Sequence, residues 1–209
     1  KKLVYRVGRA NLMVADIKNG VISNSKTYSS SWAKAEDVSW SPDSKFIAYS
    51  QEDLNFDSEI FIQSVDSPNN KFNVSMHPRS DRAPVWSPDG KKLAFASNRS
   101  GNIGGIDYDI WMVWLKKEDW ERSKTDRENG DYYVEKEAEN DKDEKKVKVK
   151  VEIDKERIFD RLARITKLPD DEYKGMFGPD SKYVYYSATA PSTNKRCFFK
   201  VKLDGSSPK

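Results

Sequence analysis

Short runs in which apolar and polar residues alternate recur along the chain, and the clearest of them follow the same tight turn. Residues 38–50, 84–96 and 176–187 align so that an aromatic residue precedes a Pro-Asp turn and alternating apolar residues follow it. Proline sets the φ angle needed at the second position of a type I turn, and aspartate bonds to its own backbone there. Because period-two alternation is typical of a half-buried strand, the pattern predicts three β-hairpins of the same construction.

The turn differs among the three copies. Gly90 follows the aspartate in the second copy, where glycine tolerates the positive φ that often follows such a turn. Ser44 and Ser181 replace this glycine in the first and third copies, and we expect each replacement to cost a little stability. The third copy also departs from the pattern in having Phe177-Gly178 in place of Trp-Ser.

The hairpins recur at a spacing that predicts a fold. Trp40 and Trp86 are 46 positions apart, and Trp86 and Phe177 are 91 apart, which is one similar period plus an insertion. Four short antiparallel strands at a period of about 45 residues are typical of β-propeller blades. Further strands are expected at residues 3–7, 12–17, 21–27, 59–65, 72–75, 109–115, 163–166 and 197–203.

We therefore predict an all-β fold, a β-propeller arc of about 3.5 four-stranded antiparallel blades, filling residues 1–209. The strands group as three, four, four and three. A closed propeller usually needs more blades, and an open arc leaves unpaired edges. Either the rest of a longer protein supplies the missing blades, or the four form an unusual four-bladed ring. The expected blades are residues 1–28, 36–76, 82–167 with an insertion at 116–162, and 173–209.

The insertion at residues 116–162 holds much of the charge. A helical turn is expected at 116–122, and the mixed charges of 135–146 predict flexible or weakly helical structure. Strict alternation at 147–153 predicts a strand, and residues 154–161 have the acidic start and apolar spacing of a short helix. The insertion is interpreted as a solvated excursion, with an interaction arm as the alternative.

Composition narrows the choice of partners. The chain has 37 basic and 34 acidic residues, and this even mixture argues against a nucleic-acid groove or an anionic membrane surface. Cys197 is the one cysteine, so neither an internal disulfide nor a thiol-rich metal site is expected. No apolar run approaches the roughly 20 residues of a membrane helix. The chain opens as if a strand were already under way, so we expect an internal stretch of a longer protein, cytoplasmic or periplasmic.

The candidates for catalysis and metal binding are few. Asp43, Asp89 and Asp180 recur one per hairpin, whereas a calcium loop needs several oxygen ligands close together. We therefore interpret them as turn residues and expect no metal and no other cofactor. His77 is the one histidine, and it precedes a proline in a predicted connection without a nucleophile motif. It is interpreted as a loop residue, and no catalytic residue is assigned.

The innermost strand of a propeller blade usually lines the central channel, so its first residues are candidates for ligand contact. Glu36, Arg82 and Tyr173 each lie four residues before the aromatic that opens a turn. They differ from one another while the turn stays nearly constant. We hypothesise that these three residues face the channel and bind substrate; the alternative is that they are ordinary loop residues.

One stretch of sequence resembles a known family. Residues 109–120, then a charged insertion, then residues 151–154 and 160–166 resemble the propeller part of tricorn-like proteases, in which a Lys- and Glu-rich insertion interrupts a blade. The resemblance covers most of the chain and is specific at this segment. The Trp-Ser-Pro-Asp-Gly turn is generic, because TolB-like propellers and the prolyl oligopeptidase family share it.

The resemblance implies a non-catalytic module of a serine peptidase that gates or routes peptides to a separate catalytic part. Its partners would be a peptide or protein substrate, the remaining propeller blades and the catalytic domain. Nucleic acid and membrane are not expected as partners, and homo-oligomerisation is left open. The alternatives are a TolB-like protein-binding scaffold with no protease, and the N-terminal propeller of a prolyl oligopeptidase relative.

Overall fold

A computed structural model describes residues 1–100, 107–128, 149–168 and 171–206, and its strands form four antiparallel sheets. Neighbours in sequence are neighbours in each sheet, as expected of blades that meander outward. The first sheet contains β1 (Lys2–Val7), β2 (Asn11–Lys18) and β3 (Val21–Ser30); the second, β4 (Ala35–Trp40), β5 (Phe46–Glu52), β6 (Ser58–Ser64) and β7 (Lys71–Asn73); the third, β8 (Asp81–Trp86), β9 (Lys92–Ser97), β10 (Asp109–Trp114) and β11 (Leu162–Arg164); the fourth, β12 (Tyr173–Phe177), β13 (Tyr183–Ala190) and β14 (Lys195–Lys202).

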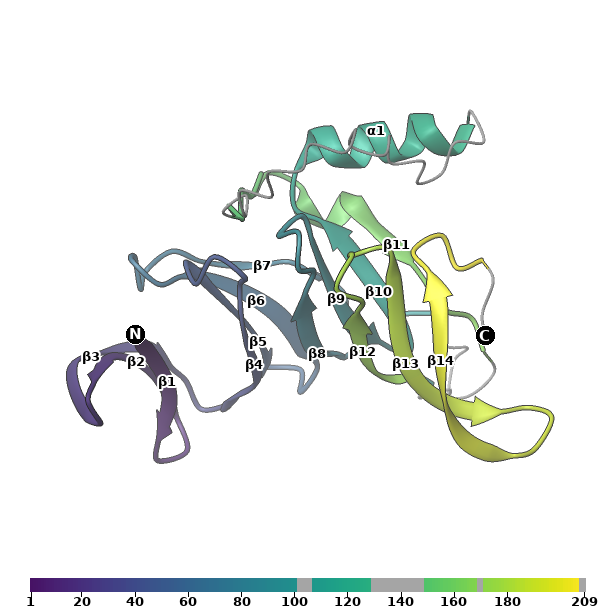
Figure 1. Ribbon diagram of the computed structural model, residues 1–209. Coiled ribbons are helices and arrows are strands. Elements are labelled where there is room, and N and C mark those ends of the chain that lie inside the picture. The colour runs from purple at the N-terminus through teal and green to yellow at the C-terminus, as the bar shows by residue number, and fades with distance from the viewer. Residues whose placement is uncertain (101–106, 129–148, 169–170, 207–209) are drawn as a thin grey trace.

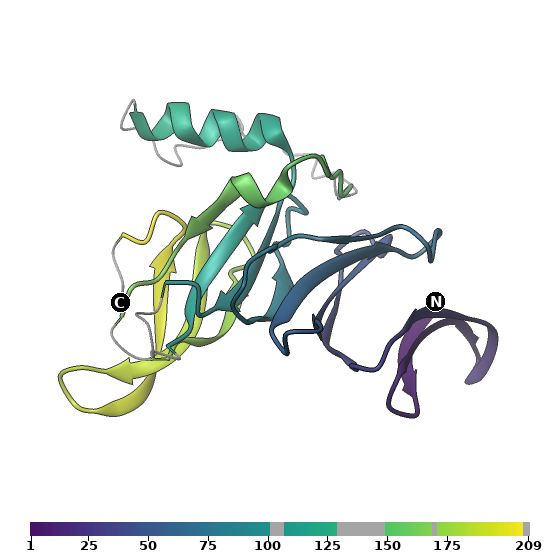
Figure 2. The same ribbon diagram turned by 180° about the vertical axis from the view of Figure 1, so that it is seen from behind.

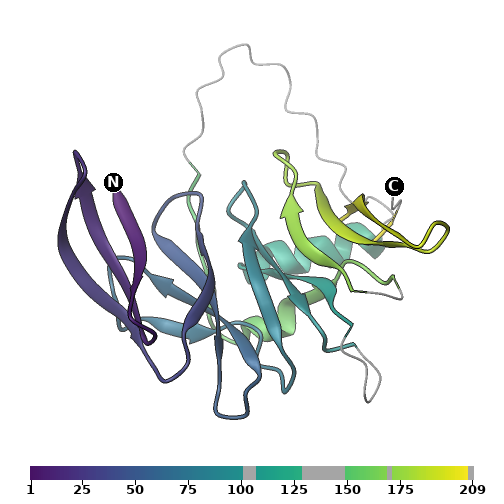
Figure 3. The ribbon, with the colours of Figure 1, turned by 90° about the horizontal axis from the view of Figure 1, so that it is seen from below.

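The four sheets follow one another around an arc in chain order (Figures 1, 2 and 3). Strand β8 contacts both β4 and β12, so the innermost strands of adjacent sheets lie side by side. The first and fourth sheets lie at opposite ends of the arc (Figure 3). The predicted all-β arc of about 3.5 blades is confirmed, with 14 strands in the described residues. The four-bladed ring is not formed.

The three Pro-Asp turns have the predicted geometry. Residues Ser44, Gly90 and Ser181 have φ angles of 61°, 72° and 58°, so two serines occupy the left-handed region that glycine prefers. In each turn the aspartate Oδ1 accepts the N–H of the lysine two residues on, at 3.1, 3.0 and 3.1 Å. These bonds to Asp43, Asp89 and Asp180 confirm that the recurring aspartates act in the turns.

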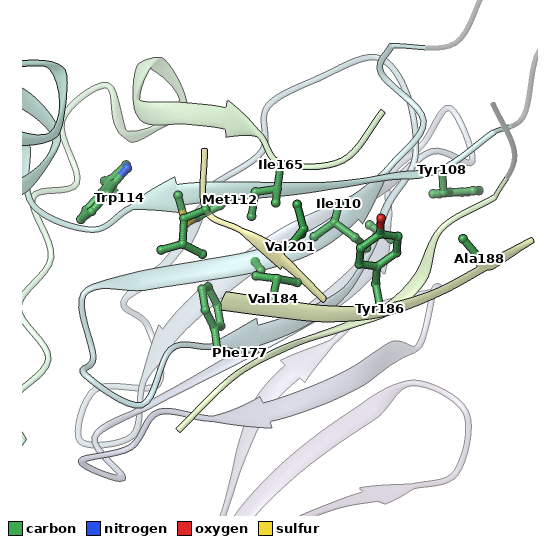
Figure 4. Close-up of a cluster of buried hydrophobic side chains, with 13 residues drawn as sticks. Tyr108, Ile110, Met112, Trp114, Ile165, Phe177, Val184, Tyr186, Ala188 and Val201 are labelled. Atoms are coloured by element: carbon green, nitrogen blue, oxygen red, sulfur yellow. The ribbon is translucent and has the colours of Figure 1, made fainter. Parts of the chain in front are cut away.

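Apolar side chains fill three interfaces between adjacent sheets, which we call the first, second and third interfaces in chain order. In the second interface Trp86 is 6% exposed, and its Nε1 donates to the Ser39 carbonyl at 3.2 Å. Phe177, also 6% exposed, takes the equivalent place in the third interface. Figure 4 shows this third core, where side chains of β10 such as Met112 face those of β13 such as Val184.

The insertion differs from its prediction in three places. The predicted helical turn is the start of a longer helix, α1 (Lys117–Glu128), and the predicted short helix is a 3₁₀ turn at Ile158–Arg161. The predicted strand at 147–153 is wrong over its described part, because residues 149–153 join no sheet. Residues 135–146 lie outside the described residues.

Residues 149–153 form no strand because they lie across the Pro-Asp turns of the second and third sheets, not beside the edge of a strand. The Val151 N–H donates to Asp43 Oδ2 at 2.9 Å, and a Cβ added to Gly90 would lie 3.0 Å from both Val149 and Val151. Its alternating valines therefore pack on the ends of the second and third sheets. Buried Arg161 anchors the end of the segment by donating to the carbonyl oxygens of Trp114 and Leu115.

Candidate functional site

The three predicted channel residues lie at the start of the inner strands. These strand starts are on the side of the arc opposite the insertion, and we call this side the rim. Glu36, Arg82 and Tyr173 lie opposite equivalent residues of the second strand of their sheets: Ser50, Ala96 and Ser187. A register shift follows each of them directly, between residues 36 and 39, 82 and 85, and 173 and 176. The strand pairing at the rim is therefore the same in three sheets, while the side chain differs in each.

The register shifts are β-bulges, which re-aim side chains at strand ends. Asp37 and Ala83, which follow Glu36 and Arg82, have φ angles of 50° and 53°. The Asp37 carboxylate accepts the Ala83 N–H at 3.2 Å and the Ser50 hydroxyl at 3.2 Å. One side chain thus links the bulges of the second and third sheets. Sequence reasoning missed Asp37, although it directly follows Glu36 in the inner strand.

The three side chains have different surroundings. Glu36 forms an ion pair with Lys34 and lines a shallow cleft of about 310 Å³ with its neighbours. Tyr173 is 36% exposed, and its ring centroid lies 5.7 Å from that of Tyr108. Burial raises the pKa of Tyr173, and the positive charge of Arg82 opposes this shift. The Arg196 guanidinium lies 5.6 Å from the centroid of the Tyr173 ring.

Behind the rim, the second interface holds two buried carboxyl groups. Asp81 precedes Arg82, is fully buried, and accepts a hydrogen bond from Arg99 at 2.9 Å. Glu59 accepts the Ser75 hydroxyl and the N–H of His77. Burial raises the pKa of both carboxyls, and the charge of Arg99 partly opposes the shift at Asp81.

The third interface repeats this arrangement. Glu172 precedes Tyr173, is fully buried, and accepts the Thr166 hydroxyl and the Leu168 N–H. Burial raises the pKa of Glu172 to about 7, and the charge of Asp109 adds to the shift. Asp109 is itself paired with Arg164 at 2.7 Å. Sequence reasoning missed Asp81 and Glu172, although both lie five residues before the aromatic of their turn.

His77 lies in the connection between β7 and β8, where the sequence placed it. Its backbone N–H donates to Glu59, while its buried Nδ1 has no hydrogen-bond partner. Burial lowers the pKa of His77, and the charge of Arg99 adds to the effect. A general base needs a proton to accept within hydrogen-bond reach, and no such donor meets Nδ1. The interpretation of His77 as a loop residue stays a prediction.

The metal-ligating side chains, the thiol and the helices of the described residues are the features that bear on cofactors and membranes. Across the described ranges, no group of three or more histidines, cysteines and carboxylates is arranged to hold a metal ion. Cys197 is an exposed free thiol on β14. No helix among the residues described in the structure is long and apolar enough to cross a membrane.

A second concave region lies on the side of the arc opposite the rim, next to the insertion. It is a cleft of about 840 Å³ between α1 and residues 153–161. Its lining mixes charges of both signs, for example Lys117 and Arg157 with Asp154 and Asp160. The candidate site is placed at the rim because the residues that the sequence nominates for ligand contact lie there at equivalent positions of three sheets.

Comparisons with known proteins support the fold. No protein-family model matches the chain, and no curated protein sequence matches it. Solved structures do match. TolB from Acinetobacter baumannii has a TM-score of 0.60 at 14% identity, over 99% of this chain and 39% of TolB. The tricorn protease has a TM-score of 0.65 at 15% identity, over 96% of this chain and 20% of the protease.

A third similar structure is a puromycin-hydrolyzing peptidase from Mycobacterium tuberculosis, with a TM-score of 0.57 at 11% identity, over 100% of this chain and 28% of the peptidase. The chain thus spans well under two thirds of each of these three proteins. At such low identities the likeness concerns the fold alone. The chain is a β-propeller region with the fold shared by TolB, the tricorn protease and peptidase propellers.

Proposed function

We propose that this chain is a non-catalytic propeller segment of a tricorn-like serine peptidase, which gates or routes peptide substrates to a separate catalytic domain. The observation that carries the proposal is a Lys- and Glu-rich insertion between β10 and β11 of a propeller arc. A similar order of elements marks the tricorn-like pattern that the sequence resembles. The likeness to the tricorn protease structure supports the fold on which the proposal rests.

Within this function, the rim is the surface proposed to meet the substrate. Glu36, Arg82 and Tyr173 offer an anion, a cation and an aromatic ring from three adjacent inner strands. The bulges beneath them fix the backbone, and Asp37 ties two of the bulges together. A fixed frame with variable side chains is suited to sorting peptides, because specificity then depends on side-chain chemistry alone.

The experiment is to determine the intact mass of the natural protein and to assay it, and this chain separately, for peptide hydrolysis. A protein several times longer than the chain that cleaves peptides, beside an inert chain, is the expected result. Replacing Arg82 with alanine in the full protein should then change the preference among peptides while leaving cleavage of a minimal substrate unchanged. A natural protein little longer than the chain, and inactive, would overturn the proposal.

The second candidate is a TolB-like scaffold that binds partner proteins without any protease. The observation that favours it is the match to TolB over 99% of this chain. Sequencing the natural protein separates the candidates, because the scaffold requires no peptidase domain. A following α/β-hydrolase domain with a nucleophile elbow would instead indicate a prolyl oligopeptidase relative.

A further inference from the structure

Three large apolar side chains stand exposed together on the rim side of the second sheet. Trp32, Leu54 and Phe56 are 50%, 83% and 71% exposed. Trp32 lies in the connection from β3 to β4, and the other two lie in the loop between β5 and β6. The rings of Trp32 and Phe56 meet edge to face, with centroids 5.4 Å apart and planes at 75°. We call these three residues the aromatic prong.

The loop that carries Phe56 is held by its own hydrogen bonds. Asp53 Oδ1 accepts the N–H groups of Asn55 and Asp57 at 2.8 and 3.2 Å, and the Asp53 N–H donates to the Asp57 carbonyl at 2.8 Å. Within this turn Phe56 has a φ of 63°. A bulky residue in the left-handed region is a genuine outlier. Such strain persists where the surroundings enforce it, and it gathers at sites that contact ligands.

The segment that carries Trp32 is fixed as well. The Ser31 N–H donates to the Ala10 carbonyl at 3.4 Å, and Gln51 Nε2 donates to the Ala33 carbonyl at 2.7 Å. Ala33 itself is buried. The prong is therefore a pair of rings presented on two anchored loops, and little freedom remains to be lost on binding. Pre-organised tryptophan and aromatic clusters of this kind dominate binding at protein interfaces.

The loop that carries Leu54 and Phe56 is itself negatively charged, although the Lys71 ammonium lies beside it and donates to Gln51 Oε1 at 2.7 Å. Residues 51–59 include four carboxylates and no lysine or arginine, and three of the four are not buried: Glu52, Asp53 and Asp57. Lys34, two residues beyond Trp32, is already ion-paired with Glu36. An apolar patch with this surrounding charge is complementary to an apolar group flanked by cations. It opposes an anionic lipid surface for the same reason.

We propose that the aromatic prong docks an extended polypeptide segment that carries an apolar side chain next to lysine or arginine. The apolar side chain contacts the exposed edges of Trp32 and Phe56 and the side chain of Leu54. The neighbouring cation faces the carboxylates of the β5–β6 loop. This site is separate from the three channel residues, and it does not require that the chain serve a peptidase.

The test measures binding of a fluorescein-labelled decapeptide with two Leu-Lys pairs in a Gly-Ser background, by fluorescence anisotropy with the whole chain. Phe56→Gly is the main variant, because glycine adopts a φ of 63° without strain, so the turn is expected to remain folded. We expect it to weaken binding by about tenfold or more, as loss of an interface hot spot does. Trp32→Ser, which leaves the turn unchanged, should do the same.

Phe198→Ser is the matched control. Phe198 is 84% exposed on β14, in the last sheet of the arc, so its loss removes a comparable ring elsewhere. It should leave the affinity within about twofold. A second peptide with glutamate in place of lysine, and a third with serine in place of leucine, should each bind about tenfold more weakly than the first.

Several results would overturn the proposal. Equal binding of the first peptide by the unaltered chain and by both prong variants would show that the prong is not the docking surface. Equal binding of the lysine and glutamate peptides would refute the proposed partner chemistry. Prong-dependent binding to neutral phosphatidylcholine vesicles, with no binding of the peptide, would identify a lipid surface instead. Circular dichroism confirms that each variant is folded before it is compared.

Discussion

The second and third interfaces place two buried carboxyl groups at equivalent positions. One is on the third strand of the earlier sheet, as Glu59 or Asp109. The other lies at the start of the inner strand of the later sheet, where Asp81 is the first residue of β8 and Glu172 directly precedes β12. The first interface lacks this pair, because Ala35 takes the place of the latter two. The repeat therefore shares a polar arrangement between two of its three interfaces.

The two interfaces neutralise their carboxyls in opposite ways. In the second, arginine pairs with the later residue, as Arg99 with Asp81; in the third, it pairs with the earlier one, as Arg164 with Asp109. The remaining carboxyl accepts a hydroxyl and a backbone N–H in both interfaces. Each of the two interfaces therefore holds one ion-paired and one hydrogen-bonded carboxyl, at exchanged positions. In the second interface the arginine satisfies Asp81 Oδ2 only, because Asp81 Oδ1 is buried without a hydrogen-bond partner.

The largest expected loss of stability comes from replacing the buried turn aromatic, which is Trp86 in the second interface and Phe177 in the third. Trp86→Ala should lower the free energy of unfolding by about 3–5 kcal/mol, because it leaves a cavity and removes the bond to the Ser39 carbonyl. Phe177→Ala, which removes no hydrogen bond, should fall at the lower end of that range. Urea denaturation measures both. A loss below about 1 kcal/mol at Trp86 would show that the second interface is not packed as described.

Replacing Arg99 and Arg164 separately tests whether the ion pairs of the second and third interfaces differ in burial. Arg99→Met should destabilise by about 3 kcal/mol, because it leaves the fully buried Asp81 carboxylate unpaired. Arg164→Met should cost less, about 2 kcal/mol, because the Arg164 side chain is 32% exposed and water can partly replace it beside buried Asp109. Equal losses in urea denaturation would mean that the two interfaces do not differ in burial as the comparison requires.

The third interface should also respond to pH. The ordinary pKa of Glu172 is 4.5, and its pKa in the folded chain is raised to about 7. The folded state therefore binds more protons than the unfolded state between these values, and stability falls as pH rises through that window. Glu172→Gln should flatten the fall, measured as the free energy of unfolding from pH 4.5 to 8. An unchanged slope in the Glu172→Gln variant would contradict the assignment of the raised pKa to Glu172. Glu59→Gln is the comparison from the second interface.

The smallest effects are expected in the turns. Ser44→Gly should stabilise the chain by about 0.5–1 kcal/mol, because Ser44 has a φ of 61° that glycine adopts freely. Ser181→Gly should change little, since the Ser181 hydroxyl accepts the Asp89 N–H at 3.0 Å across the third interface, and the substitution removes that bond. Thermal unfolding distinguishes the two. A clear gain at Ser181 would show that the bond between the turns contributes nothing.

Much of the fold was predictable from the sequence because its signals are local. The turn after Trp86 and the alternation that follows it fix a hairpin without reference to the rest of the chain. The strand predicted at 147–153 failed because alternation shows which side chains are buried, not what they are buried against. Val151 is buried, as alternation indicates, but on the ends of the sheets.

The candidate site was predictable only in part. Counting back from the turn aromatic found Arg82 and Tyr173, whose equivalent places in the bulged strands depend on that spacing. The same count one residue further back gives Asp81 and Glu172, but their burial depends on packing between sheets. The prong was missed because exposure of Phe56 depends on the left-handed turn that carries it, which composition does not reveal.

The rim, rather than the insertion, is the proposed binding surface of this propeller arc. Amide hydrogen exchange of the chain, with and without the saturating Leu-Lys peptide, tests this proposal most directly. We predict slower exchange at residues 31–34 and 53–57, which carry the prong, and unchanged exchange at 117–128 and 153–161. Slower exchange confined to α1 and residues 153–161 would contradict the account and would identify the insertion as the interaction arm.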